Sequence, residues 1–325
     1  MEKPFLTIVV PCYNEEAVLG ETVIQLTKIM DTLVDKEEIS EKSKIMFVDD
    51  GSKDKTWELI DDFTKKQKYI SGLKLSRNYG HQGALLAGLT AAYEASDCVI
   101  SIDADLQDDV NAIIPFVEKF NQGYEVVYGV RDKRDTDTFF KRNTALGFYK
   151  VMEKLGVKMV PNHADYRLLS KRALGEFLKY KEENMFIRGI IPLLGFKSTK
   201  VYYNRNERFA GESKYPLKKM LMFAVDGITS FSITPIRFLL TIGVLMFIIG
   251  VGLGIYAIVQ KILGEVVIGW TSLMVSLWLI GGIQLIAIGV LGEYIGKIFK
   301  EVKARPRFTI ENNLFEEKYK AENLK

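Results

Sequence analysis

Short apolar runs alternate with amphipathic stretches along the N-terminal part of the chain. The runs cover residues 5–10, 44–48, 72–76, 98–102 and 125–130. Between the first two runs, apolar residues recur at helical spacing, as at Leu19, Val23 and Leu26. A continuous apolar run bounded by polar turns is typical of a strand buried on both faces, and the stretches between are typical of helices. This alternation predicts an α/β fold with a doubly wound sheet and helices on both faces.

The last third of the chain has a different pattern. Residues 238–259 and 266–292 contain no charged side chain, and each stretch is long enough to cross roughly 30 Å of hydrocarbon. Either stretch alone could be a buried core helix, but two in tandem favour a transmembrane hairpin. Basic residues follow the second stretch, whereas only Lys261 and Glu265 are charged between the two. The positive-inside rule therefore predicts a multi-pass protein of the cell membrane, with both termini and the N-terminal domain in the cytoplasm.

These patterns divide the chain into four segments. Residues 1–214 form the soluble domain, residues 215–233 an amphipathic helix at the membrane interface, residues 234–296 two transmembrane helices, and residues 297–325 a basic and then mixed-charge cytoplasmic tail. The interfacial helix is predicted because its apolar and lysine residues lie on opposite sides. Small residues such as Gly250 and Gly281 would permit close helix packing, so we expect a homo-oligomer formed through the membrane region.

Charge and cysteine content narrow the class of protein. The chain has 44 Lys and Arg against 41 Asp and Glu, a formal charge of only +3, so a nucleic-acid partner is not expected. Cys12 and Cys98 both fall on predicted core strands and form no disulfide framework, which favours a reducing compartment. The N-terminus leads directly into a strand, so we expect no secretory signal peptide.

Polar clusters follow four of the predicted strands, at residues 13–15, 49–52, 77–80 and 103–109. Ligands of doubly wound sheets bind outside the carboxyl ends of the strands, where these four clusters would converge. The alternative is that all four are the ordinary polar turns of an α/β protein. The first turn contains neither G-x-G-x-x-G nor G-x-x-x-x-G-K-[ST], which excludes a dinucleotide-binding fold and a P-loop.

The last of these clusters suggests a metal site. Asp103 and Asp105 are separated only by Ala104, and crowded carboxylates repel each other unless a cation lies between them. Oxygen ligands of this kind favour Mg²⁺ or Mn²⁺, which usually also binds substrate phosphates. The alternative is an acidic turn in which Asp108 or Asp109 caps the next helix. His163 has no partner at zinc-ligand spacing, so a zinc site is not expected.

Four motifs together resemble a known family. V-V-P-C-Y-N-E-E, V-D-D-G-S-K-D-K-T, S-R-N-Y-G-H-Q-G-A and D-A-D-L-Q-D, in this order and spacing, resemble the family 2 glycosyltransferases of GT-A fold. More narrowly, they are similar to the polyprenyl-phosphate branch, which includes dolichol-phosphate-mannose-synthase-like and bactoprenol glucosyltransferase enzymes. The resemblance covers nearly the whole chain, and it implies that the predicted sheet is a mixed GT-A sheet.

The same resemblance implies a reaction. A single sugar would pass, with inversion, from a nucleotide-diphosphate sugar such as UDP-glucose to polyprenyl (undecaprenyl) phosphate at the cytoplasmic membrane face. A bound cation would neutralise the charge that develops on the departing diphosphate. One alternative is a GDP-mannose-dependent mannose synthase, and another is a non-catalytic, membrane-anchored nucleotide-binding module. A processive polysaccharide synthase is disfavoured because no Q-x-x-R-W motif is present.

Each candidate site residue receives a role from the resemblance. Asp165 would be the catalytic base, or it would instead orient the acceptor or stabilise positive charge on the sugar. The metal would be held by Asp103, Asp105 and Gln107. The nucleotide would be bound by Pro11, Tyr13, Asn14, Glu15, Asp49, Asp50, Arg77 and Asp103. The acceptor phosphate would be bound by Arg131, Arg142, Arg208, Ser213 and Lys214. Without the resemblance, the basic residues around Arg142 also fit a solvated helix face, and residues 208–215 an ordinary surface loop.

Overall fold

The computed structural model describes residues 3–132, 163–182, 185, 187–204, 234–263, 269–316 and 319. The predicted interfacial helix and four of the predicted acceptor-phosphate ligands lie outside the described residues, namely Arg142, Arg208, Ser213 and Lys214. The chain forms two compact units. One contains a β-sheet and includes the residues after Arg305, and the other contains the two long C-terminal helices.

Eight strands of the described chain form one mixed sheet, which confirms the predicted architecture. Their order is β7-β5-β6-β4-β1-β2-β3-β8. The central strands β4, β1, β2 and β3 are parallel, whereas β6 is antiparallel to both β4 and β5. The strands are β1 (Leu6–Cys12), β2 (Lys44–Asp49), β3 (Ile70–Leu75), β4 (Cys98–Ser101), β5 (Val126–Arg131), β6 (His163–Ser170), β7 (Ser198–Tyr203) and β8 (Ile310–Asn313).

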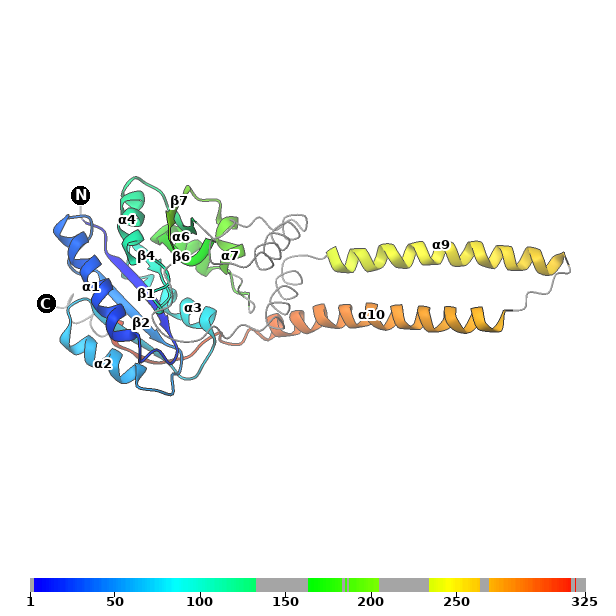
Figure 1. Ribbon diagram of the computed structural model, residues 1–325, viewed down its shortest axis with the longest axis horizontal. Helices are drawn as coiled ribbons and strands as arrows, with labels where there is room; N and C mark the ends of the chain where they lie inside the picture. The colour runs from blue at the N-terminus through cyan, green and yellow to red at the C-terminus, as the bar shows by residue number, and fades with distance from the viewer. Residues whose placement is uncertain are drawn as a thin grey trace. The chain divides into compact units, whose positions relative to one another are not determined.

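Helices pack on both faces of this sheet because the central strands are apolar on both sides. Leu6, Ile8 and Val10 of β1 join the core that includes α1, whereas Val9 faces α3, and a Cβ on Gly88 would lie only 2.4 Å from Val9 Cγ1. Figure 1 shows α1 and α3 on opposite sides of β1 and β2. The helices are α1 (Leu19–Asp35), α2 (Thr56–Lys66), α3 (His81–Ala92), η1 (Val110–Ala112), α4 (Ile113–Asn121), α6 (Lys171–Leu178), α7 (Ile187–Ile190) and η2 (Ile191–Leu194).

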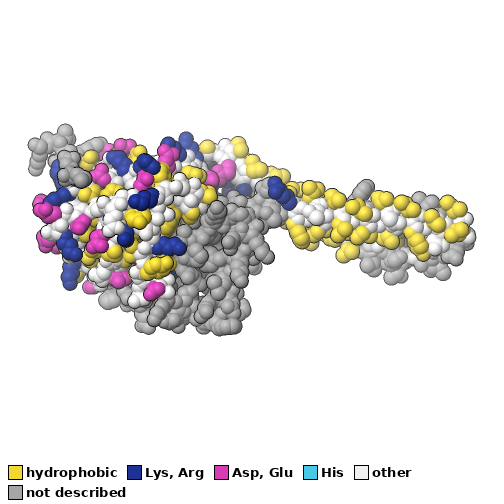
Figure 2. Space-filling view, turned by 90° about the horizontal axis from the view of Figure 1, so that it is seen from above, with side chains coloured by type: hydrophobic (Ala, Val, Ile, Leu, Met, Phe, Trp, Pro, Cys, Tyr) yellow, Lys and Arg dark blue, Asp and Glu magenta, His cyan; other side chains and the backbone are white. Residues whose placement is uncertain are grey.

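The second unit contains α9 (Thr234–Ile262) and α10 (Trp270–Lys303). Each has a segment long and apolar enough to cross a membrane, Ile236–Leu253 and Leu279–Lys303, and none of either segment is buried in the protein. Figure 2 shows apolar side chains along the outside of these helices, whereas charged side chains gather on the unit with the sheet. An exposed apolar surface of this length is stable in lipid rather than in water.

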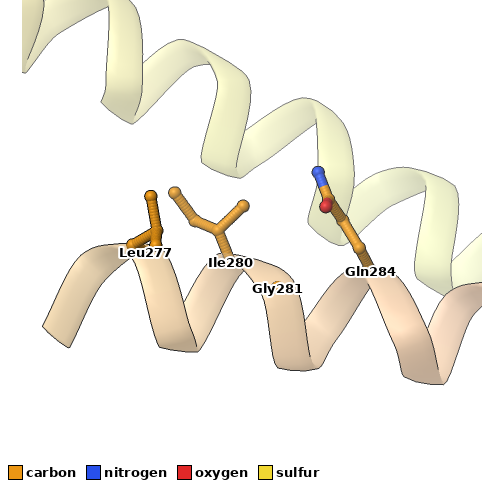
Figure 3. A pocket seen from close by; sticks show the side chains of 4 residues that line it. All are labelled: Leu277, Ile280, Gly281 and Gln284. Carbon is orange, nitrogen blue, oxygen red and sulfur yellow. The ribbon is translucent and has the colours of Figure 1, made fainter. Parts of the chain in front are cut away.

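A hollow of about 370 Å³ lies beside α10, lined by Leu277, Ile280, Gly281 and Gln284. Gln284 extends toward the neighbouring helix and is the one polar side chain of the four (Figure 3). None of these four described residues is charged, so they offer no partner for a nucleotide diphosphate. The candidate site lies instead at the ends of the strands.

The C-terminal residues return to the sheet. The sequence predicts a tail over residues 297–325, but α10 continues through Lys303. Residues Ile310–Asn313 then form β8, which pairs antiparallel with the edge strand β3. Phe315 is only 3% exposed. A strand encoded after the membrane helices is therefore part of the N-terminal domain.

Candidate active site

The loops after β1 and β2 are joined by hydrogen bonds between backbone and side chains. The Asn14 amide donates to Ser52 Oγ at 3.0 Å, and the Lys53 amide donates to Asn14 Oδ1 at 2.8 Å. The Glu15 amide donates to Thr56 Oγ1 at 2.9 Å. Asn14 has a left-handed φ of 56°, which a short amide side chain tolerates. Asn14, a predicted nucleotide ligand, thus connects the two loops.

The two aspartates at the end of β2 are buried. Asp50 Oδ1 accepts a 2.7 Å hydrogen bond from the Tyr79 amide, and Asp49 Oδ1 accepts one of 3.2 Å from the Ser52 amide. Burial raises the pKa of both carboxyls, although these amide hydrogen bonds act in the opposite direction. Pro11 is also buried, inside β1 and paired with Val48. Of the predicted nucleotide ligands in this part of the chain, Tyr13 is well exposed, at 41%.

The loop after β3 packs directly against the loop after β2. Gly51 has a φ of +67°, and a Cβ there would lie 2.6 Å from the Arg77 carbonyl carbon. The Arg77 guanidinium lies 4.1 Å from the centre of the Tyr79 ring, a cation–π contact. Arg77, predicted as a nucleotide ligand, therefore stands beside the loop that carries Asp50.

The acidic loop follows β4. The side chain of Asp103 is 39% exposed, and Asp105 Oδ1 accepts a 3.2 Å hydrogen bond from the Gln107 amide. Partial burial raises the pKa of Asp103, and so do the carboxylates of Asp165, Asp108 and Asp105, whereas His81 lowers it. Such mutual repulsion is what a divalent cation would relieve.

The donor atoms of this loop fit Mg²⁺ or Mn²⁺ in kind, because both ions prefer carboxylate and amide oxygens. Among the residues that the structure describes, no three His, Cys, Asp or Glu side chains are gathered to hold an ion. One or two carboxylates with substrate phosphates and water are a common Mg²⁺ site. Asp103, Asp105 and Gln107 would therefore need the donor diphosphate to complete the coordination.

Strand β6 brings Asp165 next to Asp103. His81 Nε2 lies 3.5 Å from Asp103 Oδ1 and 3.8 Å from Asp165 Oδ2. Asp165 Oδ2 accepts hydrogen bonds from Arg188 Nη2 at 2.8 Å and from Arg188 Nε at 3.2 Å. Its other oxygen accepts from Arg167, which is 2% exposed. Burial acts to raise the pKa of Asp165, but Arg188 and Arg167 outweigh burial and lower that pKa far below its usual range.

Arg131, a predicted acceptor-phosphate ligand, forms an ion pair within the protein. Its Nη2 donates to Asp108 Oδ1 at 3.1 Å, and the Tyr203 hydroxyl donates to the same oxygen at 2.7 Å. The side chain of Arg131 is 28% exposed and that of Asp108 only 1%. Tyr203 and Arg131 therefore hold the C-terminal part of the acidic loop against β5 and β7.

Several residues of the site were absent from the sequence-based prediction. The sequence assigns no role to His81, Arg167, Arg188 or Tyr203. Arg167 has a detectable signal, since it stands between the apolar residues Tyr166 and Leu168, and a buried arginine needs an anionic partner. Arg188 lies in a short helix 23 residues beyond Asp165, and no local pattern connects the two.

Two parts of the chain match known protein families. Residues 7–178 match the model of Glycosyl transferase family 2, and residues 234–298 match the GtrB C-terminal hairpin. The chain belongs to the family 2 glycosyltransferases, with a GT-A sheet and a C-terminal hairpin of two apolar helices.

Relatives match along almost the full chain. "Uncharacterized glycosyltransferase YkoT" of Bacillus subtilis (strain 168) is 58% identical over 97% of this chain and 94% of that protein. "Bactoprenol glucosyl transferase" of Shigella phage SfX is 38% identical over 94% of this chain and 99% of that protein. "Prophage bactoprenol glucosyl transferase homolog" of Escherichia coli (strain K12) is 38% identical over 94% of this chain and 98% of that protein.

Proposed function

We propose that this glycosyltransferase moves one glucose, or a closely related sugar, from a UDP-sugar to a polyprenyl phosphate, with inversion at the anomeric carbon. The observation that carries the proposal is that His81 lies 3.5 Å from Asp103 of the half-buried acidic loop and 3.8 Å from Asp165 of the charge cluster, in a chain that also has a hairpin for a lipid environment. The relatives named bactoprenol glucosyl transferase, similar along their full length, favour this donor and acceptor.

The donor would bind across the loops that follow β1, β2, β3 and β4. Tyr13 offers an exposed ring for the base, and the other proposed nucleotide ligands in these loops are Pro11, Asn14, Glu15, Asp49, Asp50 and Arg77. Asp103, Asp105 and Gln107 would hold Mg²⁺ or Mn²⁺ on the diphosphate. When bound, such an ion stabilises the negative charge that develops on the leaving group.

The acceptor would attack as an anion. An oxygen of the acceptor phosphate forms the new bond to the anomeric carbon, while the bond from that carbon to the diphosphate breaks. A phosphate monoester has a second pKa of about 6 and is largely dianionic at neutral pH. Asp165 keeps its negative charge between two arginines. We therefore infer that Asp165 orients these groups and stabilises positive charge on the sugar, and that it removes no proton.

The acceptor site is assigned from the family resemblance. Arg131, Arg142, Arg208, Ser213 and Lys214 are proposed to bind the lipid phosphate, and only Arg131 lies among the described residues. Arg131 would have to share its guanidinium between Asp108 and that phosphate. The hairpin would keep the domain at the cytoplasmic face of the cell membrane, with both termini in the cytoplasm. A homo-oligomer formed through the membrane helices remains part of this proposal.

Transfer by the purified full-length protein tests the proposal. The protein would be incubated in lipid vesicles with undecaprenyl phosphate, Mn²⁺ and, in separate reactions, UDP-glucose, UDP-N-acetylglucosamine or GDP-mannose. We expect release of UDP and a glucosylated lipid only when the lipid phosphate and the metal are both present. Product from GDP-mannose alone would establish a mannose synthase instead. Nucleotide binding without any product would support a non-catalytic module.

A further inference from the structure

The segment after the membrane helices is built into the edge of the sheet beside the donor loops. In the antiparallel pair of β3 and β8, Leu73 is opposite Asn313, Lys74 opposite Asn312, and Leu75 opposite Ile310. Pairing continues past the strand, since the Ser76 amide donates to the Thr309 carbonyl at 3.0 Å. The contact thus reaches the first residue of the loop that carries Arg77 and Tyr79.

Apolar and polar contacts hold this segment in place. Phe315 is buried, and Leu314 Cδ1 lies 3.4 Å from the Cβ position of Gly72 in the middle of β3. The Lys74 ammonium pairs with Glu311 Oε1 at 2.9 Å. At the other end, Arg307 Nη1 donates to the Tyr180 carbonyl at 3.1 Å. Residues 306–316 therefore form a docked element of the N-terminal domain.

One chain of contacts leads from this element to a buried aspartate of the donor site. The hydroxyl of Tyr79 lies 3.2 Å from Oγ of Ser76, the residue whose amide is bonded to the Thr309 carbonyl. The Ser76 and Thr309 side chains both lower the pKa of Tyr79. The backbone amide of the same tyrosine donates to Asp50 Oδ1 at 2.7 Å. Thr309 is thus connected through Ser76 to the residue that orients Asp50, and the Arg77 guanidinium lies against the ring of that tyrosine.

We propose that residues 306–316 are a positioning element of the donor-nucleotide site, with Thr309 as the positioning residue. This inference rests on the proposed function, because it assigns the loops after β2 and β3 to nucleotide binding. Without β8, β3 would be an unpaired edge strand, and the loop at Ser76 would lose its backbone partner. Six residues separate α10 from β8, so the segment that positions the donor loop is also the one that connects it to the membrane hairpin.

The position of β8 after the membrane helices affects the design of a soluble fragment. Cutting the chain before Phe238 would remove the hairpin, and it would also remove β8 and Phe315. Such a fragment is expected to have weakened nucleotide binding, and failure of the fragment to bind UDP would not mean that the membrane is needed for binding. Point variants of the full chain therefore give the cleaner test.

The test compares Thr309→Val, Tyr79→Phe and the double variant with wild type, all full length. UDP affinity is measured by calorimetry, the KM values for UDP-glucose and undecaprenyl phosphate by transfer assay, and the protection of residues 72–80 by hydrogen exchange. Thr309→Val should raise the Kd for UDP and the donor KM by about threefold to tenfold, an effect of the size of one hydrogen bond, because the polar group of Thr309 next to Tyr79 is removed. The acceptor KM and kcat should not change, and the double variant should match Tyr79→Phe.

Thr32→Val is the matched control, because the Thr32 hydroxyl bonds only the Lys28 carbonyl on an exposed part of α1. It should leave every measured value at the wild-type level. Unchanged UDP affinity in Thr309→Val overturns the inference, and so does an equal fall in kcat, acceptor affinity and Tm, which would indicate a purely structural role. A wild-type protein that binds no UDP overturns the proposed function itself.

Discussion

The two halves of the candidate site are held together by different forces. The donor half, formed by residues 11–15, 49–52 and 76–80, is joined by short hydrogen bonds from backbone amides, such as those to Asp50 and Ser52. In the charged half, formed by Asp103, Asp105, Asp165, Arg167 and Arg188, the two arginines form ion pairs with Asp165, whereas Asp103 and Asp105 repel each other. Amide hydrogen bonds fix a shape before substrate arrives, whereas ion pairs can be exchanged for substrate charges. Substitutions in the donor half should therefore change nucleotide affinity, and those in the charged half should change turnover.

The largest effect is expected from Asp105→Asn, which removes one charge from the charged half without changing volume. Turnover should fall by roughly 100-fold or more, because several kcal/mol of charge stabilisation depend on the ion. When the rate of sugar transfer is measured at increasing Mn²⁺ concentration, the Mn²⁺ concentration that gives half of the maximal rate (the Mn²⁺ midpoint) should be higher than in wild type. Asp61→Asn, at an exposed ion pair on α2, is the control and should behave as wild type. A wild-type rate with an unchanged Mn²⁺ midpoint would remove Asp105 from the metal site.

Asp165→Asn separates a charge role from a base role. Because Arg188 and Arg167 lower the pKa of Asp165, the carboxylate is ionised throughout the working range. Turnover should fall by about 100-fold, the lower end for a general base. The loss should stay constant between about pH 6 and pH 9, across which the acceptor phosphate becomes fully dianionic. A pH–rate profile in which the variant recovers at high pH would establish Asp165 as the base.

The same variant should show a stability effect that depends on pH. The pKa of Asp165 is lowered by folding, so the carboxylate stabilises the fold above its unfolded pKa of about 3.9. This contribution is lost as the pH falls through the folded pKa. At neutral pH, Asp165→Asn should lower the free energy of unfolding by about 3 kcal/mol, because Arg167 loses a buried partner. Thermal melts at decreasing pH should show the difference shrinking, and a constant difference would contradict the ion-pair account.

Gly51→Ala tests the donor half. The left-handed backbone costs a residue with a Cβ about 1–2 kcal/mol, and the new methyl would collide with the Arg77 backbone. UDP affinity should fall about tenfold or more, since each 1.4 kcal/mol is a factor of ten. Gly123→Ala is the control, because Gly123 has a φ of +83° with no heavy atom near its Cβ position. Equal loss of affinity in both variants would show that strain alone, and not separation of the loops, is responsible.

The smallest effect is expected from Tyr203→Phe, which removes one of the two hydrogen bonds that Asp108 accepts at Oδ1. Buried Asp108 should lose about 1–2 kcal/mol of stabilisation, and the Mn²⁺ midpoint should rise slightly because the acidic loop is less constrained. Tyr202→Phe is the control, since the neighbouring tyrosine is 61% exposed. Equal effects of the two variants on Tm and on the Mn²⁺ midpoint would exclude this role of Tyr203.

Local patterns in the sequence were sufficient to predict much of the fold. The five predicted apolar runs became β1 to β5 with boundaries moved by one or two residues, because strands buried on both faces must be apolar at every position. The polar clusters follow these strands, and parallel strands bring their carboxyl ends to one edge. The hairpin was also predictable, because long uncharged stretches are stable only where no water competes for the surface.

Pairing between distant segments could not be predicted in the same way. Strand β6 enters the sheet between β4 and β5, antiparallel to both, and only this insertion brings Asp165 to Asp103 and His81. The charge on Asp165 depends on Arg188, whose position follows from the packing of α7. A pairing of this kind is selected by burial and hydrogen bonding summed over the whole domain, and no periodic signal in one segment records it.

The sequence by itself thus determined the family, the classes of residue at the strand ends and the presence of an apolar hairpin, because each depends on neighbours in the chain. Only the tertiary structure decided that Asp165 is an ion-paired carboxylate, that Arg131 forms an ion pair with Asp108, and that residues 310–313 complete the sheet next to the donor loops. These three features depend on contacts between residues 2 to 240 positions apart, from Asp165 and Arg167 to Leu73 and Asn313. Their energies come from burial and charge in three dimensions, which composition and spacing do not specify.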